Sequence, residues 1–319
     1  MSKSKYILKR ILIAIPVFFG ITILAYFISS MMPGGPLEAL ASDPSMTAAE
    51  IERRKIELGL DQPVIVQYLK WLTSMLQGNF GYSYRTNLPV LKTILDRLWP
   101  TLLLTLAATV VSLVIALPLG ILAGLKPYSF WDYLSSGLSF FMAATPNFFV
   151  GLLFIYIFSV KLGILPMGGM YDSSGVPTWG MLFKHMIMPT FVLAFQQIGS
   201  LIRYMRGSML EVMQEDYIRT ARAKGLKYSA VVVGHALKNA LIPIITMVGM
   251  SIPVMVGGAV VTEQIFGWPG IGSLMVISIN ARDYPVIMGI TVLVALVVLI
   301  GNLVTDLVYS VADPRISYK

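Results

Sequence analysis

Long runs of apolar residues, separated by polar intervals, dominate the pattern of this chain. A helix that crosses the hydrocarbon core of a bilayer needs about 20 consecutive apolar residues. Six runs reach or approach that length, at residues 11–31, 101–125, 137–160, 187–202, 240–261 and 286–311. The pattern therefore predicts an all-α integral membrane protein with six transmembrane helices.

Four cations precede the first apolar run: Lys3, Lys5, Lys9 and Arg10. A cleaved signal peptide is the competing interpretation, because it also begins with a basic segment. The run at 11–31 is longer than a signal-peptide core, and no small-residue cleavage site follows it closely. We expect a transmembrane helix that stays in the protein and ends in the Pro- and Gly-rich segment 31–36.

The interval at residues 37–99 is polar and mixed in character. Apolar residues recur at helical spacing in AAEIERRKIELG (48–59) and in LPVLKTILDRLW (88–99), which predicts two amphipathic helices. We expect a small external subdomain here. Its seven cations are compatible with an outside location, since loops of this length cross the membrane largely regardless of charge.

The cations in the other polar intervals indicate how the chain is oriented. Lys and Arg are enriched in short cytoplasmic loops. Seven cations lie between Arg203 and Lys238, whereas the short loops on the opposite side hold only Lys161, Lys184 and Arg282. With six spans, this distribution predicts that both termini lie in the cytoplasm and that the protein resides in the cell membrane.

Composition agrees with this interpretation and excludes other classes. Of the 319 residues, 56% are hydrophobic and 13% are charged, whereas a soluble domain has about 25% charged residues. The net charge is +8, but the cations gather at the ends of apolar runs and in one loop, and no nucleic-acid-binding module is recognisable. We therefore expect membrane lipids, and no nucleic acid, around this chain. Thiol chemistry is excluded because there is no cysteine.

Motifs for catalysis are missing from the sequence. It contains no G-x-x-x-x-G-K-[ST] loop, and its two histidines, His185 and His235, are too far apart for an H-E-x-x-H site. We expect a transport subunit and no enzyme, with no catalytic residue, metal ion or cofactor of its own. For both histidines a packing contact is favoured over proton transfer.

The longest strongly charged interval after residue 100 lies at 214–239. Its apolar residues recur at roughly helical spacing with cations between them, up to an interruption at Gly225. The pattern predicts a short amphipathic helix, with a second helix starting at Lys227. A basic linker that lies on the lipid headgroups is the alternative.

Polar groups within spans could mark a translocation path. Gln196 and Gln197 lie mid-span, where interhelical hydrogen bonding is the simpler explanation and a polar path is the other. The charged residues near span ends are expected to snorkel or to pair at the interface: Arg203, Arg206, Glu263 and Asp306. An ion-coupled secondary transporter is the principal rival class. Such a transporter needs charged groups deep inside its spans, and the spans of this sequence lack them.

The stretch FGWPGIG at 266–272 follows the fifth apolar run. A Trp in this place commonly anchors a helix at the membrane interface. The Pro and Gly residues are compatible with a gate-like turn and equally with simple packing. Phe266 and Trp268 therefore join the two glutamines as candidate path or gate residues.

Several motifs together resemble those of one transporter family. The segment DYIRTARAKG at 216–225, with HAL at 235–237, resembles the cytoplasmic signature of permease subunits from binding-protein-dependent ABC importers, in the form of the dipeptide, oligopeptide and nickel group. The long external interval is similar to that of the first of two permease subunits. Further matches are GIT at 20–22, PG at 33–34, LGLD at 58–61, FGWPGIG at 266–272, RDYPV at 282–286 and DPRI at 313–316.

This resemblance implies the type I ABC importer fold and import of di- or oligopeptides, with nickel chelate, glutathione or oligosaccharide as alternative cargo. It implies two ATPase subunits that bind ATP and Mg, a second related permease that completes the pore, and an extracytoplasmic substrate-binding protein. It also implies that 214–239 is a coupling segment, whose matched residues are Asp216, Tyr217, Ile218, Arg219, Ala221, Arg222, Gly225 and His235.

The expected organisation follows from the runs and the resemblance together. An N-terminal tail and first helix occupy 1–32, and the external subdomain occupies 33–96. The importer core with helices two to six occupies 97–311 and includes the coupling segment. A cytoplasmic tail follows at 312–319.

Overall fold

The computed structural model describes residues 3–31, 47–57, 59–172, 176–257 and 259–312. Within these ranges the regular structure is helical, apart from one isolated β-bridge between Tyr82 and Pro89. The motifs at 33–34 and 313–316 and nearly all of the predicted tail lie outside the described residues. The prediction of an all-α protein is confirmed.

Five helical stretches of the described chain are long and apolar enough to cross a membrane, and a bent helix pair makes up to six. The long helices are α1 (Lys3–Ser30), α5 (Val90–Leu125), α8 (Trp179–Val212) and α15 (Tyr284–Ala312). The remaining continuous stretch begins at α10 (Tyr228–Val231) and runs through η2 (Val232–Ala236) and α11 (Leu237–Ala240) into α12 (Ile242–Gly257). Six apolar segments are present, as the pattern predicts.

The third segment, which the apolar run at 137–160 predicts, is not one straight helix. It consists of α6 (Phe130–Ala144) and of α7 (Asn147–Phe154) with its continuation η1 (Ile155–Lys161), and these two parts meet at 96°. The break falls at Thr145 and Pro146. Proline disfavours the helical conformation of the residue before it, and Thr145 is extended with ψ 124°. The apolar run predicted at 137–160 therefore corresponds to a bent helix pair.

The part of the chain that was predicted to be external also differs from the expected pattern. A helix is confirmed at α3 (Ala48–Glu57), and α4 (Val64–Leu76) was not predicted. The expected separate helix at 88–99 is instead the start of α5, which continues through Pro100. Its 36 residues correspond to about 54 Å, so α5 extends well beyond a hydrocarbon core of about 30 Å.

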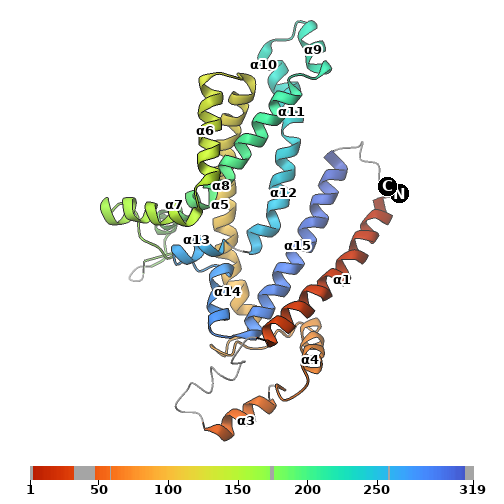
Figure 1. The fold of residues 1–319 in the computed structure, drawn as a ribbon, viewed down its shortest axis with the longest axis vertical. Helices are drawn as coiled ribbons and strands as arrows, with labels where there is room; N and C mark the ends of the chain where they lie inside the picture. The colour runs from red at the N-terminus through yellow and green to blue at the C-terminus, as the bar shows by residue number, and fades with distance from the viewer. Residues whose placement is uncertain (1–2, 32–46, 58, 173–175, 258, 313–319) are drawn as a thin grey trace.

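The core of the molecule is the long contact between α5 and α8, which lie side by side (Figure 1). Small residues of α5 at four-residue spacing, including Ala116, Gly120 and Gly124, face α8 and let the two backbones approach closely. A Cβ atom at Gly120 would lie 2.6 Å from Met205 Cβ, and one at Gly124 would lie 2.5 Å from Met209 Cβ. Neither position has room for a side chain.

The two ends of the molecule carry different structures (Figure 1). Helices α9 (Asp216–Ala223) and α10 project at one end, and α3 and α4 lie at the other. The first turn of α1 and the last turn of α15 lie near each other, toward the end that carries α9. The core therefore separates the charged segment from the subdomain that was predicted to be external.

The loop before α5 is attached to the turn between α14 (Ile271–Asn280) and α15. Ser83 Oγ donates a hydrogen bond to the carboxylate of Asp283, and Tyr84 N–H donates to Asp283 Oδ1 at 3.0 Å. Ser83 and Asp283 are both buried. Burial raises the pKa of the Tyr84 phenol to about 12. This contact joins segments that are 200 residues apart.

Candidate functional site

The charged segment forms a helix, a sharp turn and a second helix at the tip of the molecule (Figure 1). Asp216 lies in the first turn of α9, where the positive end of the helix dipole stabilises a carboxylate. The helix ends before Gly225, which has φ +78°, in a left-handed region that glycine adopts without steric cost. The next helix starts at Tyr228, directly after Lys227. The predicted helix, interruption and second helix are confirmed.

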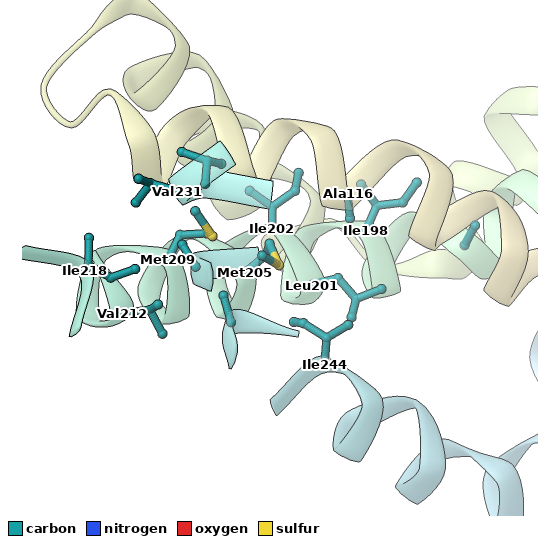
Figure 2. Packing of buried hydrophobic residues seen from close by; sticks show 14 of the residues in the cluster. Ala116, Ile198, Leu201, Ile202, Met205, Met209, Val212, Ile218, Val231 and Ile244 are labelled. Carbon is teal, nitrogen blue, oxygen red and sulfur yellow. The ribbon is translucent and has the colours of Figure 1, made fainter. Parts of the chain in front are cut away.

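One face of α9 is anchored in the core. Ile218 is fully buried and Ala221 is 7% exposed. Figure 2 shows Ile218 beside Val212 and Met209 of α8, with Val231 of α10 in the same cluster. Helix α9 therefore packs against the end of α8, and it is not a free linker.

The opposite face of α9 is exposed and carries polar groups. Tyr217, Arg219 and Arg222 lie on it. Arg219 pairs with Asp216 at 3.4 Å, with both side chains largely exposed, and the Arg222 guanidinium lies 5.7 Å from the ring centroid of Tyr228. Contacts this exposed stabilise the segment little. They leave the charges available for an outside partner.

Tyr217 and His235 occupy the edges of this segment. Partial burial raises the pKa of the Tyr217 phenol, the nearby Glu215 charge raises it further, and a hydrogen bond with Asn239 lowers it. That bond connects α9 to α11. His235 lies in η2 with an exposed side chain, and its carbonyl oxygen accepts a hydrogen bond from Asn239 Nδ2 at 2.9 Å. The structure thus places Asp216–Gly225 in α9 and the turn that follows it. His235 lies beyond α10, in η2.

His185, in α8, lies at the other end of the core. Its ring is buried, with Nδ1 2.9 Å from Gly168 O and Nε2 3.2 Å from Asp172 Oδ1. Gly169 N–H in the same loop donates to Phe266 O at 2.7 Å. His185 therefore makes the expected packing contact, and its partner is a loop.

Most of the FGWPGIG stretch is buried, although Gly267 is exposed. Phe266 is 1% exposed and Trp268 is fully buried. Trp268 Nε1–H donates a hydrogen bond to Pro100 O of α5 at 2.9 Å. Within this chain the geometry favours the packing alternative for both aromatic residues.

Glu263 in α13 (Val260–Ile265) does not snorkel, so the expectation for this residue is wrong. It is fully buried, and its carboxylate accepts hydrogen bonds from Thr101 Oγ1 at 2.9 Å and from Ser273 N–H, in the first turn of α14, at 2.8 Å. A Cβ at Gly270 would collide with the same carboxylate. In the sequence, a Glu shortly before a Gly-rich turn was the signal for a functional role of Glu263. Its partner Thr101 is distant in the sequence and is placed next to it by the fold.

Mid-span amides make contacts between helices. Gln197 Oε1 accepts a hydrogen bond from Ser112 Oγ of α5 at 3.2 Å. Gln196 Oε1 accepts one from Asn147 Nδ2, at the start of α7, at 3.1 Å. Gln197 is half-buried and Gln196 is exposed. The two adjacent glutamines therefore face different surroundings.

An ion pair whose acidic partner the sequence did not reveal holds the first turn of α6 to α8. Asp132, whose side chain is 5% exposed, accepts hydrogen bonds from Arg206 Nε and Nη2 at 2.5 and 2.9 Å. Tyr128 N–H donates to the same carboxylate. Interfacial pairing was expected for Arg206, but its partner could not be identified from local sequence. Arg203 instead lies over the ring of Phe140, and the side chain of Asp306 lies outside the described ones.

No group of three or more His, Asp or Glu residues that could hold a metal ion occurs among the described residues. The features at the two ends of the core are an anchored amphipathic helix and a buried hydrogen-bond network. In the described part of the chain, these features are suited to binding and transmitting movement.

Comparison with known proteins identifies the family. Residues 116–318 match the binding-protein-dependent transport system inner membrane component, and residues 3–105 match the N-terminal component of the same systems. The oligopeptide transport system permease AppB of Bacillus subtilis is 47% identical over 99% of this chain and its own full length. The dipeptide transport system permease DppB of Escherichia coli is 35% identical, and the glutathione permease GsiC of Escherichia coli is 37% identical, each over at least 98% of both chains.

A solved structure shows the same fold. The MetNI methionine ABC transporter, in an inward-facing conformation, aligns with a TM-score of 0.55 and 16% identity, over 70% of this chain and 97% of that chain. Type I ABC importer architecture, as the motifs imply, is confirmed. The chain belongs to the family of binding-protein-dependent transport system inner membrane components.

Proposed function

We propose that this chain is a permease subunit of an ATP-driven ABC importer that carries di- or oligopeptides across the cell membrane. The single observation that carries the proposal is full-length similarity to oligopeptide and dipeptide permeases, at 47% and 35% identity. A second related permease completes the pore. Separate ATPases bind ATP and Mg, and an extracytoplasmic protein delivers the peptide. Both termini lie in the cytoplasm.

The segment at 214–239 couples this chain to the ATPase. Its buried face, at Ile218 and Ala221, attaches α9 to the end of α8. Its exposed face presents Tyr217, Arg219 and Arg222 outward. A short helix that is held rigidly on one side and offers charge on the other can transmit rigid-body motion between subunits. Glu215, N-terminal to α9, and His235 complete the edges of this surface.

The peptide crosses at the interface between the two permeases, and Gln196 lies on that path. Its exposed mid-span amide is the observation that supports this placement. Gln197 is directed toward α5 and serves packing, as do Phe266 and Trp268. The external subdomain, residues 37–99, is the candidate surface for the binding protein or for substrate entry. Glutathione is a second candidate cargo, because the glutathione permease is 37% identical.

Transport assays in vesicles test this function. The complete transporter, reconstituted with its partner subunits and binding protein, should take up oligoalanine peptides when ATP is supplied to the ATPase side. A protonophore should leave this uptake intact. Uptake that persists without ATP and collapses with the protonophore would establish the rival ion-coupled class.

A glutathione competition identifies the cargo. Excess oligoalanine should abolish uptake of labelled peptide, while glutathione at the same concentration should compete weakly. Uptake of labelled glutathione together with no uptake of labelled peptide would assign the second candidate.

A further inference from the structure

Helix α4 carries a row of exposed apolar side chains at the end of the molecule opposite α9 (Figure 1). Its sequence, VIVQYLKWLTSML, contains one charged residue, Lys70. The large apolar residues on its exposed side recur at helical spacing and are between 38% and 65% exposed: Ile65, Val66, Leu69 and Leu76. A continuous apolar surface of this kind marks a contact with another molecule or with lipid.

The other side of α4 packs against α1. Tyr68 OH lies 3.1 Å from Thr22 Oγ1, and both residues are buried. Tyr26 OH donates a hydrogen bond to Gln67 Oε1 at 3.5 Å. The ring of Trp71 also contacts that of Tyr26, with 5.8 Å between the centroids. Hydrogen bonds and aromatic contacts therefore fix α4 to one level of α1.

That level lies inside the apolar span of α1. The span covers 23 residues, Leu8–Ser30, which corresponds to about 35 Å and slightly exceeds a hydrocarbon core of about 30 Å. Thr22 lies eight residues before the end of this span, about 12 Å along the helix axis. Tyr68, its partner, and the neighbouring Leu69 are therefore at the depth of the hydrocarbon. Leu24, on the adjoining part of α1, is 63% exposed.

The polar groups on the exposed side of α4 are compatible with hydrocarbon. A hydroxyl in lipid needs a partner within the protein, and Thr73 Oγ1 donates to Leu69 O at 3.0 Å and to Lys70 O at 2.9 Å. The long side chain of Lys70 can carry its ammonium group to the lipid headgroups while its methylene groups stay in apolar surroundings. This side of α4 therefore offers lipid no unpaired hydroxyl.

We propose that α4 is an interfacial helix whose exposed side lies among the acyl chains of the leaflet at this end of α1. In the proposed topology this is the outer leaflet. The inference goes beyond the proposed function, because it gives the region between α1 and α5 a lipid anchor whatever the cargo. Helix α3, with the exposed ion pairs Arg53–Glu57 and Lys55–Glu52, stays on the aqueous side.

A spin label on a single cysteine tests this contact, since the chain has no cysteine of its own. The complete transporter, with partner subunits free of reactive cysteine, carries a nitroxide on Leu69→Cys in nanodiscs of phosphatidylcholine and phosphatidylglycerol. Oxygen concentrates among acyl chains, whereas chromium oxalate stays in water. The label at this position should collide with oxygen severalfold more often than with chromium oxalate.

Two further labelled positions serve as controls. Glu52→Cys replaces a side chain of α3 that is 61% exposed, and its label should show the opposite preference, for chromium oxalate. Ile65→Cys lies one turn before Leu69 on the same side of α4. Its label should behave as the one at Leu69→Cys does, which shows that a single substitution has not displaced the helix.

Three results would overturn the inference. A preference for chromium oxalate at both Leu69→Cys and Ile65→Cys would place this side of α4 in water. Low collision rates with both reagents in the assembled transporter would assign it to a contact with the second permease. Collisions with chromium oxalate that disappear when the binding protein is added would assign it to that protein.

Discussion

At the scale of single residues, the backbone of Gly225 sets the direction in which the chain leaves α9. Its φ of +78° is available to glycine, whereas a residue with a Cβ is strained there. Gly207, in α8, differs in that its φ is not positive, and a Cβ there would meet no atom within 4 Å. The same substitution at these two glycines therefore separates backbone strain from added bulk.

We expect Gly225→Leu to add about 1–2 kcal/mol of local strain and to alter the position of α9 relative to α10. The complex should assemble and hydrolyse ATP, while peptide uptake per ATP falls severalfold, as measured in reconstituted vesicles. Gly207→Leu is the control and should retain coupling. Normal uptake per ATP by Gly225→Leu would contradict the assignment of this segment to coupling.

At the scale of elements, the contact between α5 and α8 determines where the proposed coupling segment at 214–239 is held. Gly124 lies against Met209, and Met209 belongs to the cluster that buries Ile218 of α9. The same glycine thus supports helix packing and the anchoring of α9. The backbone can shift little to accept a side chain at Gly124, because α5 and α8 are both regular helices in close contact.

Gly124→Leu should force α5 and α8 apart and destabilise the protein by about 1–3 kcal/mol, which would lower the Tm of the detergent-solubilised chain by several degrees. Gly137→Leu, at an exposed position of α6 where a Cβ meets nothing within 4 Å, should leave the Tm nearly unchanged. Equal Tm values for the two variants would refute the packing argument.

At the scale of the whole molecule, one buried carboxylate connects the segment before α5 to the turn before α15. Asp283 accepts hydrogen bonds from Ser83 and Tyr84, and nearby Gly289 leaves no room between α15 and the side chains of Val90 and Ile94. The end of the molecule that carries α3 and α4 is therefore closed by contacts between distant parts of the chain.

Asp283→Ala should release this segment, because it removes two hydrogen bonds and leaves the buried Ser83 hydroxyl and the partly buried Tyr84 N–H without this acceptor. A loss of about 1–3 kcal/mol should raise trypsin cleavage after the exposed Arg85 roughly tenfold in nanodiscs. Asp61→Ala changes an exposed carboxylate between α3 and α4 and should not alter cleavage. An unaltered cleavage rate in Asp283→Ala would disprove the closure.

Local patterns were sufficient for much of the molecule. The apolar runs predicted the membrane-spanning helices because the bilayer requires a minimum length of apolar helix. The spacing around Ile218 and Ala221 predicted an amphipathic α9, and Gly225 marked its end, because helix periodicity and glycine backbone freedom act over a few residues. The family motifs were likewise contiguous stretches.

Only the tertiary structure decided the contacts between distant segments. The right-angle turn at Pro146, the continuation of α5 through Pro100, and the burial of Glu263 against Thr101 and Ser273 all depend on neighbours supplied by other helices. A proline can kink a helix or be accommodated in it, and an acid near a span end can face water or hydrogen-bond donors. The sequence determined which segments enter the membrane, whereas the packing of those segments decided which polar groups found partners, since desolvation is offset only where a partner is placed.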